Sequence, residues 1–134
     1  MSDAFRFGFA ALVSLAVALA SAQTRPSDTI PAAGGNITIT PINHATLQLT
    51  HGSHVIDIDP VAQGNYANLA APGIILITDI HGDHLDPATV AKLKTATTTV
   101  VAPAAAAAKL PGAIVIANGE TKTVDGVTIE AGNP

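Results

Sequence analysis

The chain of 134 residues contains no cysteine and no tryptophan, and only 3% of its residues are aromatic. Without thiols it can form neither disulfides nor thiolate metal sites, so any bound metal must be held by His, Asp or Glu. Because large aromatic side chains are scarce, a core must be built from Ile, Val, Leu and Ala, which suits strands covered by helices. The length allows one domain at most.

Charge is also scarce: 12% of the residues are charged, and the formal net charge is −4. No basic patch appears, which argues against a nucleic-acid partner. In contrast, the stretch "TDIHGDHLD" at 78–86 concentrates two histidines and three aspartates at the end of an apolar run. Such groups are costly to bury unpaired, so their clustering indicates a shared cationic partner.

The first 22 residues have the form of a secretory signal. Arg6 precedes the apolar run "FGFAALVSLAVALA", and the small residues "ASA" follow at 20–22. This order predicts cleavage after Ala22 and a periplasmic or secreted product. The alternative is an uncleaved membrane anchor, although the apolar run is short for a full span. Contact with a membrane is expected only through this segment.

The next part of the chain predicts a linker and a hairpin. Residues 23–36 are rich in Pro, Gly, Ser and Thr, as linkers are. The alternation of polar and apolar residues in 36–42 predicts a half-buried strand. Two strand-like runs, 45–50 and 54–59, flank a turn that contains glycine, which predicts a hairpin. Pro60 has no amide hydrogen for a strand ladder and should end the second strand.

The segment 73–118 predicts α/β organisation. "GIILITDI" at 73–80 is nearly continuously apolar, as expected of a strand that is buried on both faces. Asp86 and Pro87 suit the N-cap and first position of a helix over 86–96. A strand, a second helix, a third buried strand and a final hairpin with an Asp-Gly turn should follow, at 97–103, 104–110, 113–118 and 120–132.

The cluster Asp79-x-His81-x-Asp83-His84 carries the chemistry. It lies where a buried strand ends, the edge at which loops of α/β proteins converge on active sites. Residues 79, 81 and 83 would project to one side of an extended loop. The donor set suits zinc, or manganese or iron. The alternative is a polar loop that caps the next helix, but capping explains neither histidine nor Asp79.

"TDIHGDHLD" resembles the metal-binding signature of the metallo-β-lactamase superfamily, His-x-His-x-Asp-His after a buried strand. "INHATLQLTHGSHVIDIDP" resembles the opening hairpin of its metal-dependent hydrolase branch similar to L-ascorbate-6-phosphate lactonase. The resemblance covers about residues 37–131. It implies an α/β fold (α+β in some schemes), with 37–134 forming the amino-terminal half of an αβ/βα sandwich.

The resemblance also implies roles for the residues of the loop. His81 would bind the first of two metals, and Asp83 and His84 would bind the second. Asp83 would also act in catalysis by orienting or deprotonating the attacking water. Asp79 occupies the position of the superfamily's usual first histidine, and a carboxylate there should favour manganese or iron or weaken the first site.

Two further residues are implied near the loop. Asp59, at the end of its strand, would support the metal ligands through hydrogen bonds. His44 would lie at the mouth of the site, facing substrate or supporting a ligand; the alternative is a strand-end histidine bonded to backbone. His51 and His54 flank a turn and receive no role.

The superfamily's remaining ligands come from the second half of its fold, and this sequence has no histidine after His84. The chain is therefore expected to be the amino-terminal half of a longer protein, a truncated product, or a half that assembles with another chain, with truncation favoured. An uncovered sheet face of such a half should promote self-association. The predicted function is hydrolysis of a small ester, lactone, amide or phosphoester by metal-activated water. The alternative is a non-catalytic metal-binding remnant or a secreted structural domain.

Overall fold

The computed structural model describes residues 25–132, so the predicted signal segment, 1–22, lies outside the described residues. The strands are β1 Asp28–Ile30, β2 Ile37–Asn43, β3 Thr46–His51, β4 His54–Ile58, β5 Ile74–Leu76, β6 Thr99–Ala102, β7 Ile114–Val115, β8 Thr121–Val124 and β9 Val127–Glu130. The helices are α1 Pro87–Leu93 and α2 Ala104–Ala107. Neither helix in this part of the chain has the length and apolar character that a bilayer crossing requires.

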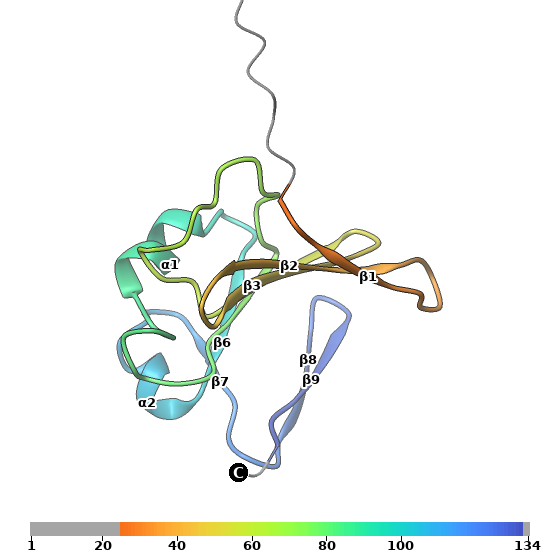
Figure 1. The fold of residues 1–134 in the computed structure, drawn as a ribbon. Helices are drawn as coiled ribbons and strands as arrows, with labels where there is room; N and C mark the ends of the chain where they lie inside the picture. The colour runs from red at the N-terminus through yellow and green to blue at the C-terminus, as the bar shows by residue number, and fades with distance from the viewer. Residues whose placement is uncertain (1–24, 133–134) are drawn as a thin grey trace, which may run out of the picture.

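Seven strands form one sheet in the order in which they occur along the chain, β1 to β7 (Figure 1). Strands β1 to β4 pair antiparallel, whereas β4 to β7 pair parallel. Each parallel pair needs a crossover connection. The crossovers from β5 to β6 and from β6 to β7 contain α1 and α2, as the strand–helix alternation of the sequence predicts.

The central parallel strands β5 and β6 are buried on both faces because different elements cover each face. Ile75 points to the face that packs against α1 and α2. Its neighbour Ile74 points to the opposite face, which packs against β8 and β9. Figure 1 shows the two helices on one side of the sheet and the β8–β9 hairpin on the other. Alternating side chains of one short strand therefore contribute to two separate apolar clusters.

The β8–β9 hairpin forms a second, two-stranded sheet. Asp125 and Gly126 both have positive φ, 48° and 79°, as a tight two-residue turn requires. This confirms the Asp-Gly turn that the sequence predicts. A two-stranded hairpin is marginal by itself, and its apolar side, including Val124 and Ile129, is stabilised by packing against the larger sheet.

The prediction of a linker over 23–36 is wrong for residues 28–30. These residues form β1 and pair with Ile37–Ile39 of β2. The Pro- and Gly-rich composition instead marks the turn between the two strands, where Gly34 and Gly35 adopt φ of 83° and 125°. Because all three residues of β1 are exposed, the strand has no apolar periodicity that would reveal it in the sequence.

Two of the predicted buried strands are shorter than expected. The strand predicted at 73–80 is regular only over Ile74–Leu76, and that predicted at 113–118 only over Ile114–Val115. Ile114 and Val115 are 38% and 45% exposed, so the prediction of burial is wrong for them. The reason is topological: β7 forms the edge of the sheet, and the next residue, Ile116, is the one that packs under the hairpin.

One buried carboxylate leads to a stability prediction. The Asp57 side chain in β4 is fully buried, and its Oδ1 accepts a hydrogen bond from Gln48 Nε2 at 2.7 Å. Its Oδ2 has no hydrogen-bond partner. Burial raises the pKa of Asp57 above its ordinary value, and the Gln48 hydrogen bond only partly opposes this. The ionised carboxylate therefore lowers the free energy of unfolding.

We expect Asp57→Asn to raise the free energy of unfolding at pH 7 by about 1 kcal/mol, because the amide keeps the Gln48 contact without a buried charge. The contribution of Asp57 to the free energy of unfolding should fall as pH rises above 3.8, the ordinary pKa of Asp57, because only the unfolded state readily loses the proton. The gain from Asn should therefore vanish below that pH. Urea unfolding at several pH values checks this, with exposed Asp28→Asn as control. Destabilisation by Asp57→Asn at every pH would contradict it.

Candidate metal centre

The segment between β5 and α1 forms a turn, so the prediction of an extended loop is wrong. The backbone N–H groups of His84 and Leu85 both donate to His81 O, at 3.0 and 2.9 Å. Leu85 is buried in the apolar cluster beneath the helices and anchors the turn. As a result, Asp83 and His84 lie on the turn itself, and the side chains of 79, 81 and 83 do not share one extended edge.

The cap of α1 fixes the far end of this turn. Asp86 is the N-cap: its Oδ1 accepts from Ala88 N at 3.1 Å, and its Oδ2 accepts from Thr89 Oγ1 at 2.6 Å. Pro87 occupies the first turn of the helix, where a missing N–H costs nothing. The predicted capping role is confirmed. Both carboxylate oxygens of Asp86 are bonded to the first turn of α1. Asp79 and Asp83 are therefore the carboxylates that this segment leaves exposed.

A buried carboxylate holds His84 in place. Asp59 follows β4 directly and is 2% exposed. Its Oδ1 accepts from Thr78 N at 2.7 Å, and its Oδ2 accepts from Thr78 Oγ1 and from His84 Nδ1, the latter at 2.8 Å. Asp59 has the uncommon φ of 47°, which places its carboxylate at the carboxyl end of β5. The two segments that the resemblance links, 59 and 78–84, therefore meet in the fold.

This contact sets the tautomer of His84. Because Asp59 accepts only, the Nδ1 of His84 carries the hydrogen and donates it, and Nε2 is left with a lone pair when the ring is neutral. The Asp59 hydrogen bond also raises the pKa of His84 above its ordinary value. A histidine that donates one nitrogen to a carboxylate and presents the other is typical of metal ligands.

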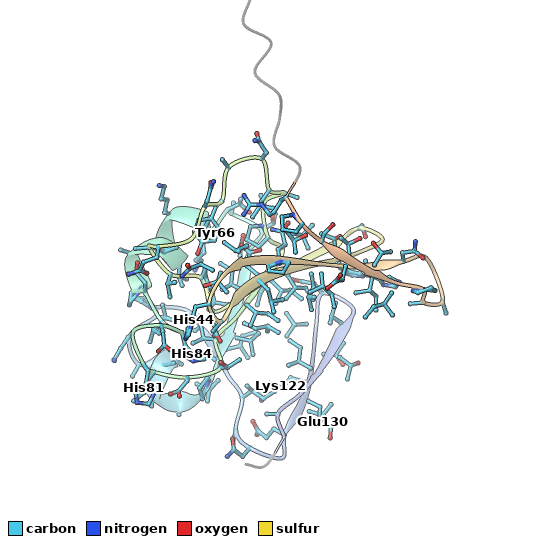
Figure 2. All side chains as sticks on the ribbon, viewed as in Figure 1. His44, Tyr66, His81, His84, Lys122 and Glu130 are labelled. Carbon is cyan, nitrogen blue, oxygen red and sulfur yellow. The ribbon has the colours of Figure 1, made fainter. Side chains whose placement is uncertain are left out.

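Asp83 lies between His84 and His44. Asp83 Oδ2 is 3.7 Å from His84 Nε2 and 3.3 Å from His44 Nε2. His44 has φ of 48°, an uncommon backbone conformation for a non-glycine residue that is often found at functional sites. Figure 2 shows His44 and His84 beside each other. The structure thus brings His44, Asp83 and His84 to one place, although the roles of these residues stay predictions.

Asp79 and His81 form a separate pair. His81 Nδ1 and Asp79 Oδ2 are 2.9 Å apart. The His81 hydrogen bond, helped by the N–H of Ile80, lowers the pKa of Asp79 below its ordinary value. The His81 side chain is 73% exposed and lies at the periphery in Figure 2. With its Nδ1 engaged by the carboxylate, His81 presents Nε2 to solvent.

The four predicted ligands are not gathered into one cluster. Within residues 25–132, no group of three or more His, Asp or Glu side chains is arranged to hold a metal ion. The donors are nevertheless of a suitable kind, because neutral imidazole and carboxylate bind zinc, manganese and iron. Asp79, His81 and Asp83 are about half or more exposed, whereas Asp59 keeps His84 fixed.

Thr78 was missed in the sequence. Its hydroxyl donates to Asp59 Oδ2 and lies 3.1 Å from His84 Nδ1, so it holds the carboxylate against the histidine. A threonine at the end of a strand carries no special signal, and its partner Asp59 lies 19 residues earlier in the chain. His51 and His54 lie at the far ends of β3 and β4, and His51 Nε2 contacts Ala33 O at 3.1 Å.

Comparison with solved structures finds a protein from Parabacteroides distasonis ATCC 8503 that is named "Putative metal-dependent hydrolase". It is 35% identical to this chain, with a TM-score of 0.74, over 80% of this chain and 50% of its own. Neither the models of known protein families nor the curated proteins give a match.

The likeness confirms the predicted α/β fold, which this chain shares with the Parabacteroides protein over the aligned region. The chain spans about half the length of the Parabacteroides protein. The site described above lies within this shared type of fold, at the carboxyl end of a parallel strand. Because only this part of the fold is shared, hydrolase activity is a proposal for this chain.

Proposed function

We propose that this chain is a metal-dependent hydrolase that acts on a small ester, lactone, amide or phosphoester. The observation that carries the proposal is the hydrogen bond from His84 Nδ1 to the buried carboxylate of Asp59, which leaves His84 Nε2 facing Asp83. The fold likeness to a protein named as a metal-dependent hydrolase supports it. The similarity to the L-ascorbate-6-phosphate lactonase branch rests on the sequence motifs alone.

Within this proposal the residues divide into two pairs of ligands. Asp79 and His81 would hold one metal, and Asp83 and His84 another, with zinc, manganese or iron as the ion. A bound divalent metal would lower the pKa of a coordinated water and so supply a nucleophile near neutral pH. Asp59 and Thr78 orient His84 by hydrogen bonds, so its imidazole enters the site in one tautomer.

Asp83 and His44 would handle the proton. The Asp83 carboxylate lies 3.3 Å from His44 Nε2, close enough for a proton taken up by the carboxylate to pass to the imidazole after a small adjustment. The His44 side chain is 69% exposed, so the proton can then leave to solvent. Asp83 therefore serves as general base, and His44 connects it with bulk water.

The test uses the full chain loaded with zinc, manganese or iron, with p-nitrophenyl acetate and bis-p-nitrophenyl phosphate as substrates. Metal-dependent hydrolysis should appear, and Asp83→Asn at saturating metal should lower kcat by about 10²–10⁴-fold, the usual worth of a general base. His54→Ala is the control, because His54 lies at the hairpin turn away from the site. Equal rates with and without metal would contradict the proposal.

A second candidate is a metal-binding chain without catalysis. It is favoured by the separation of the ligands into pairs, since the described residues gather no group of three. Stoichiometric metal binding without hydrolysis of either substrate would support this alternative. Export to the periplasm or outside the cell is proposed from the signal-like segment 1–22, and sequencing the mature amino terminus, expected at Gln23, checks it.

A further inference from the structure

A cleft of about 340 Å³ opens beside the candidate metal centre. It lies beyond the carboxyl ends of β5, β6 and β7 and is closed on the other side by the end of β9. Its walls are formed by residues at and just after these strand ends. Ligands of open α/β sheets bind at this edge, and the volume is within the range of small-molecule pockets.

The cleft and the candidate metal centre share Thr78. Its hydroxyl is bonded to Asp59 and lies 3.1 Å from His84 Nδ1, while the same residue lines the cleft. A molecule lying in the cleft would therefore end next to His84. The cleft thus continues the proposed site on the side of the β8–β9 hairpin.

The floor of the cleft is apolar. Four aliphatic side chains from the hairpin-side cluster form the floor: Leu76, Val101, Ile116 and Ile129. Thr78 and Asn118 also line the cleft, whereas Glu130 alternates with Ile129 along β9 and is exposed on the other face of the hairpin (Figure 2). Lys122 lies directly across from Ile129 in β8 and pairs with Glu120 at 3.5 Å, so the apolar floor, and not the surrounding charge, distinguishes the cleft.

We infer that this cleft binds the aliphatic acyl chain of the substrate, which makes the substrate class an acyl ester, lactone or amide. The identity of the bond that is cleaved rests on the proposed function. The binding of the acyl chain in the cleft does not. Each methylene that enters the cleft leaves water, so affinity rises with chain length until the floor is filled.

Binding is tested without catalysis, on the full chain with no metal added, using octanamide and butanamide as neutral probes. Octanamide should bind at least about tenfold more tightly than butanamide, a conservative figure for four buried methylenes. It should shift the methyl resonances of Leu76, Val101 and Ile129. Equal affinity, or shifts confined to other residues, would overturn the inference.

The variant is Gly132→Phe. Gly132 lines the cleft, and a Cβ there meets no atom within 4 Å, so a phenyl ring beside the cleft needs no backbone shift. A thermal unfolding curve verifies that the fold is kept. Ala91→Phe, on the exposed part of α1 beside a different cavity, is the matched control. Gly132→Phe should weaken octanamide binding by at least about tenfold, in line with the buried area lost, whereas Ala91→Phe should not.

The outcomes separate this inference from the proposed function. Octanamide binding without metal-dependent hydrolysis of p-nitrophenyl octanoate would support the cleft and count against the hydrolase. Hydrolysis of acetate and octanoate esters with equal kcat/KM, unchanged by Gly132→Phe, would support the hydrolase and overturn the cleft. If the same methyl resonances shift with protein concentration alone, a second copy covers the cleft and the inference is also overturned.

Discussion

Zinc binding should be lost when His84 is replaced by alanine and retained when His51 is replaced. His84 is the one predicted ligand that the fold already holds in a fixed tautomer, through the 2.8 Å hydrogen bond to Asp59. Losing a residue that merely supports a metal ligand costs up to about a hundredfold in metal affinity. Because His84 is itself the proposed ligand, its removal should lower zinc affinity by more than that. Calorimetric titration of zinc into the full chain measures this.

The control is informative because His51 differs from His84 only in its surroundings. Its Nε2 contacts a backbone carbonyl, Ala33 O, at 3.1 Å, at the far end of the β2–β3–β4 sheet. His51→Ala should therefore bind zinc like the wild-type chain. If His51→Ala and His84→Ala lose the same affinity, or neither loses any, the turn at 81–84 is not the metal centre.

Asp59→Asn tests whether the buried carboxylate acts through His84. Asparagine tolerates the positive φ of this position, so the fold should be preserved. Losing a supporting carboxylate should lower zinc affinity at pH 8 by about 10–100-fold. A purely structural role for Asp59 predicts a lower melting temperature with unchanged affinity, and that result would argue against a positioning role.

The pH dependence provides an independent readout. Imidazole binds a metal only when it is neutral, and the Asp59 hydrogen bond raises the pKa of His84 above its ordinary value of 6.5. Protons therefore compete more strongly, and zinc affinity should start to fall at a higher pH than for an unperturbed histidine. In Asp59→Asn the pKa of His84 should drop, so the fall in affinity should move to lower pH even though binding at pH 8 is weaker.

Local signals in the sequence predicted the elements that depend on local chemistry. Asp86 and Pro87 mark the start of α1, and Asp125-Gly126 marks the turn of the last hairpin, because caps and tight turns are determined by a few adjacent residues. β1 was not predicted, since its three exposed residues form a strand only through pairing with β2. The exposure of Ile114 and Val115 depends on the order of strands in the sheet, which composition does not reveal.

For the candidate site, too, the sequence predicted some features and not others. The residue types that suit a metal were visible in the cluster 79–84, and Asp59 was expected nearby through the family resemblance. The conformation of the turn was not predicted, because it depends on hydrogen bonds to His81 O and on the burial of Leu85. Thr78 was missed because its role comes from a contact with Asp59 across 19 residues of chain. Residue identity predicts the donors, whereas their arrangement depends on tertiary contacts.

Asp79→His should raise zinc affinity and lower the preference for manganese. Imidazole is a better zinc ligand than a hard carboxylate, and the change restores the superfamily pattern that the loop resembles. Asp79 is 45% exposed, so the larger ring has room. We expect an increase of about tenfold, equivalent to roughly 1.4 kcal/mol. Zinc and manganese titrations of the variant and the wild-type chain, at a pH where histidine is neutral, measure both effects.

This substitution distinguishes two roles for Asp79. In the structure, Asp79 Oδ2 lies 2.9 Å from His81 Nδ1, so the carboxylate could serve either as a ligand or as the group that orients His81. If Asp79 is a ligand, histidine can take its place and zinc binds more tightly. If Asp79 only orients His81, the variant loses that hydrogen bond and zinc binds more weakly than in the wild-type chain. Asp79→Asn is the matched control: it removes the charge in either role, so it should weaken zinc binding, and equal affinities for Asp79→His, Asp79→Asn and wild type would exclude Asp79 from the site altogether.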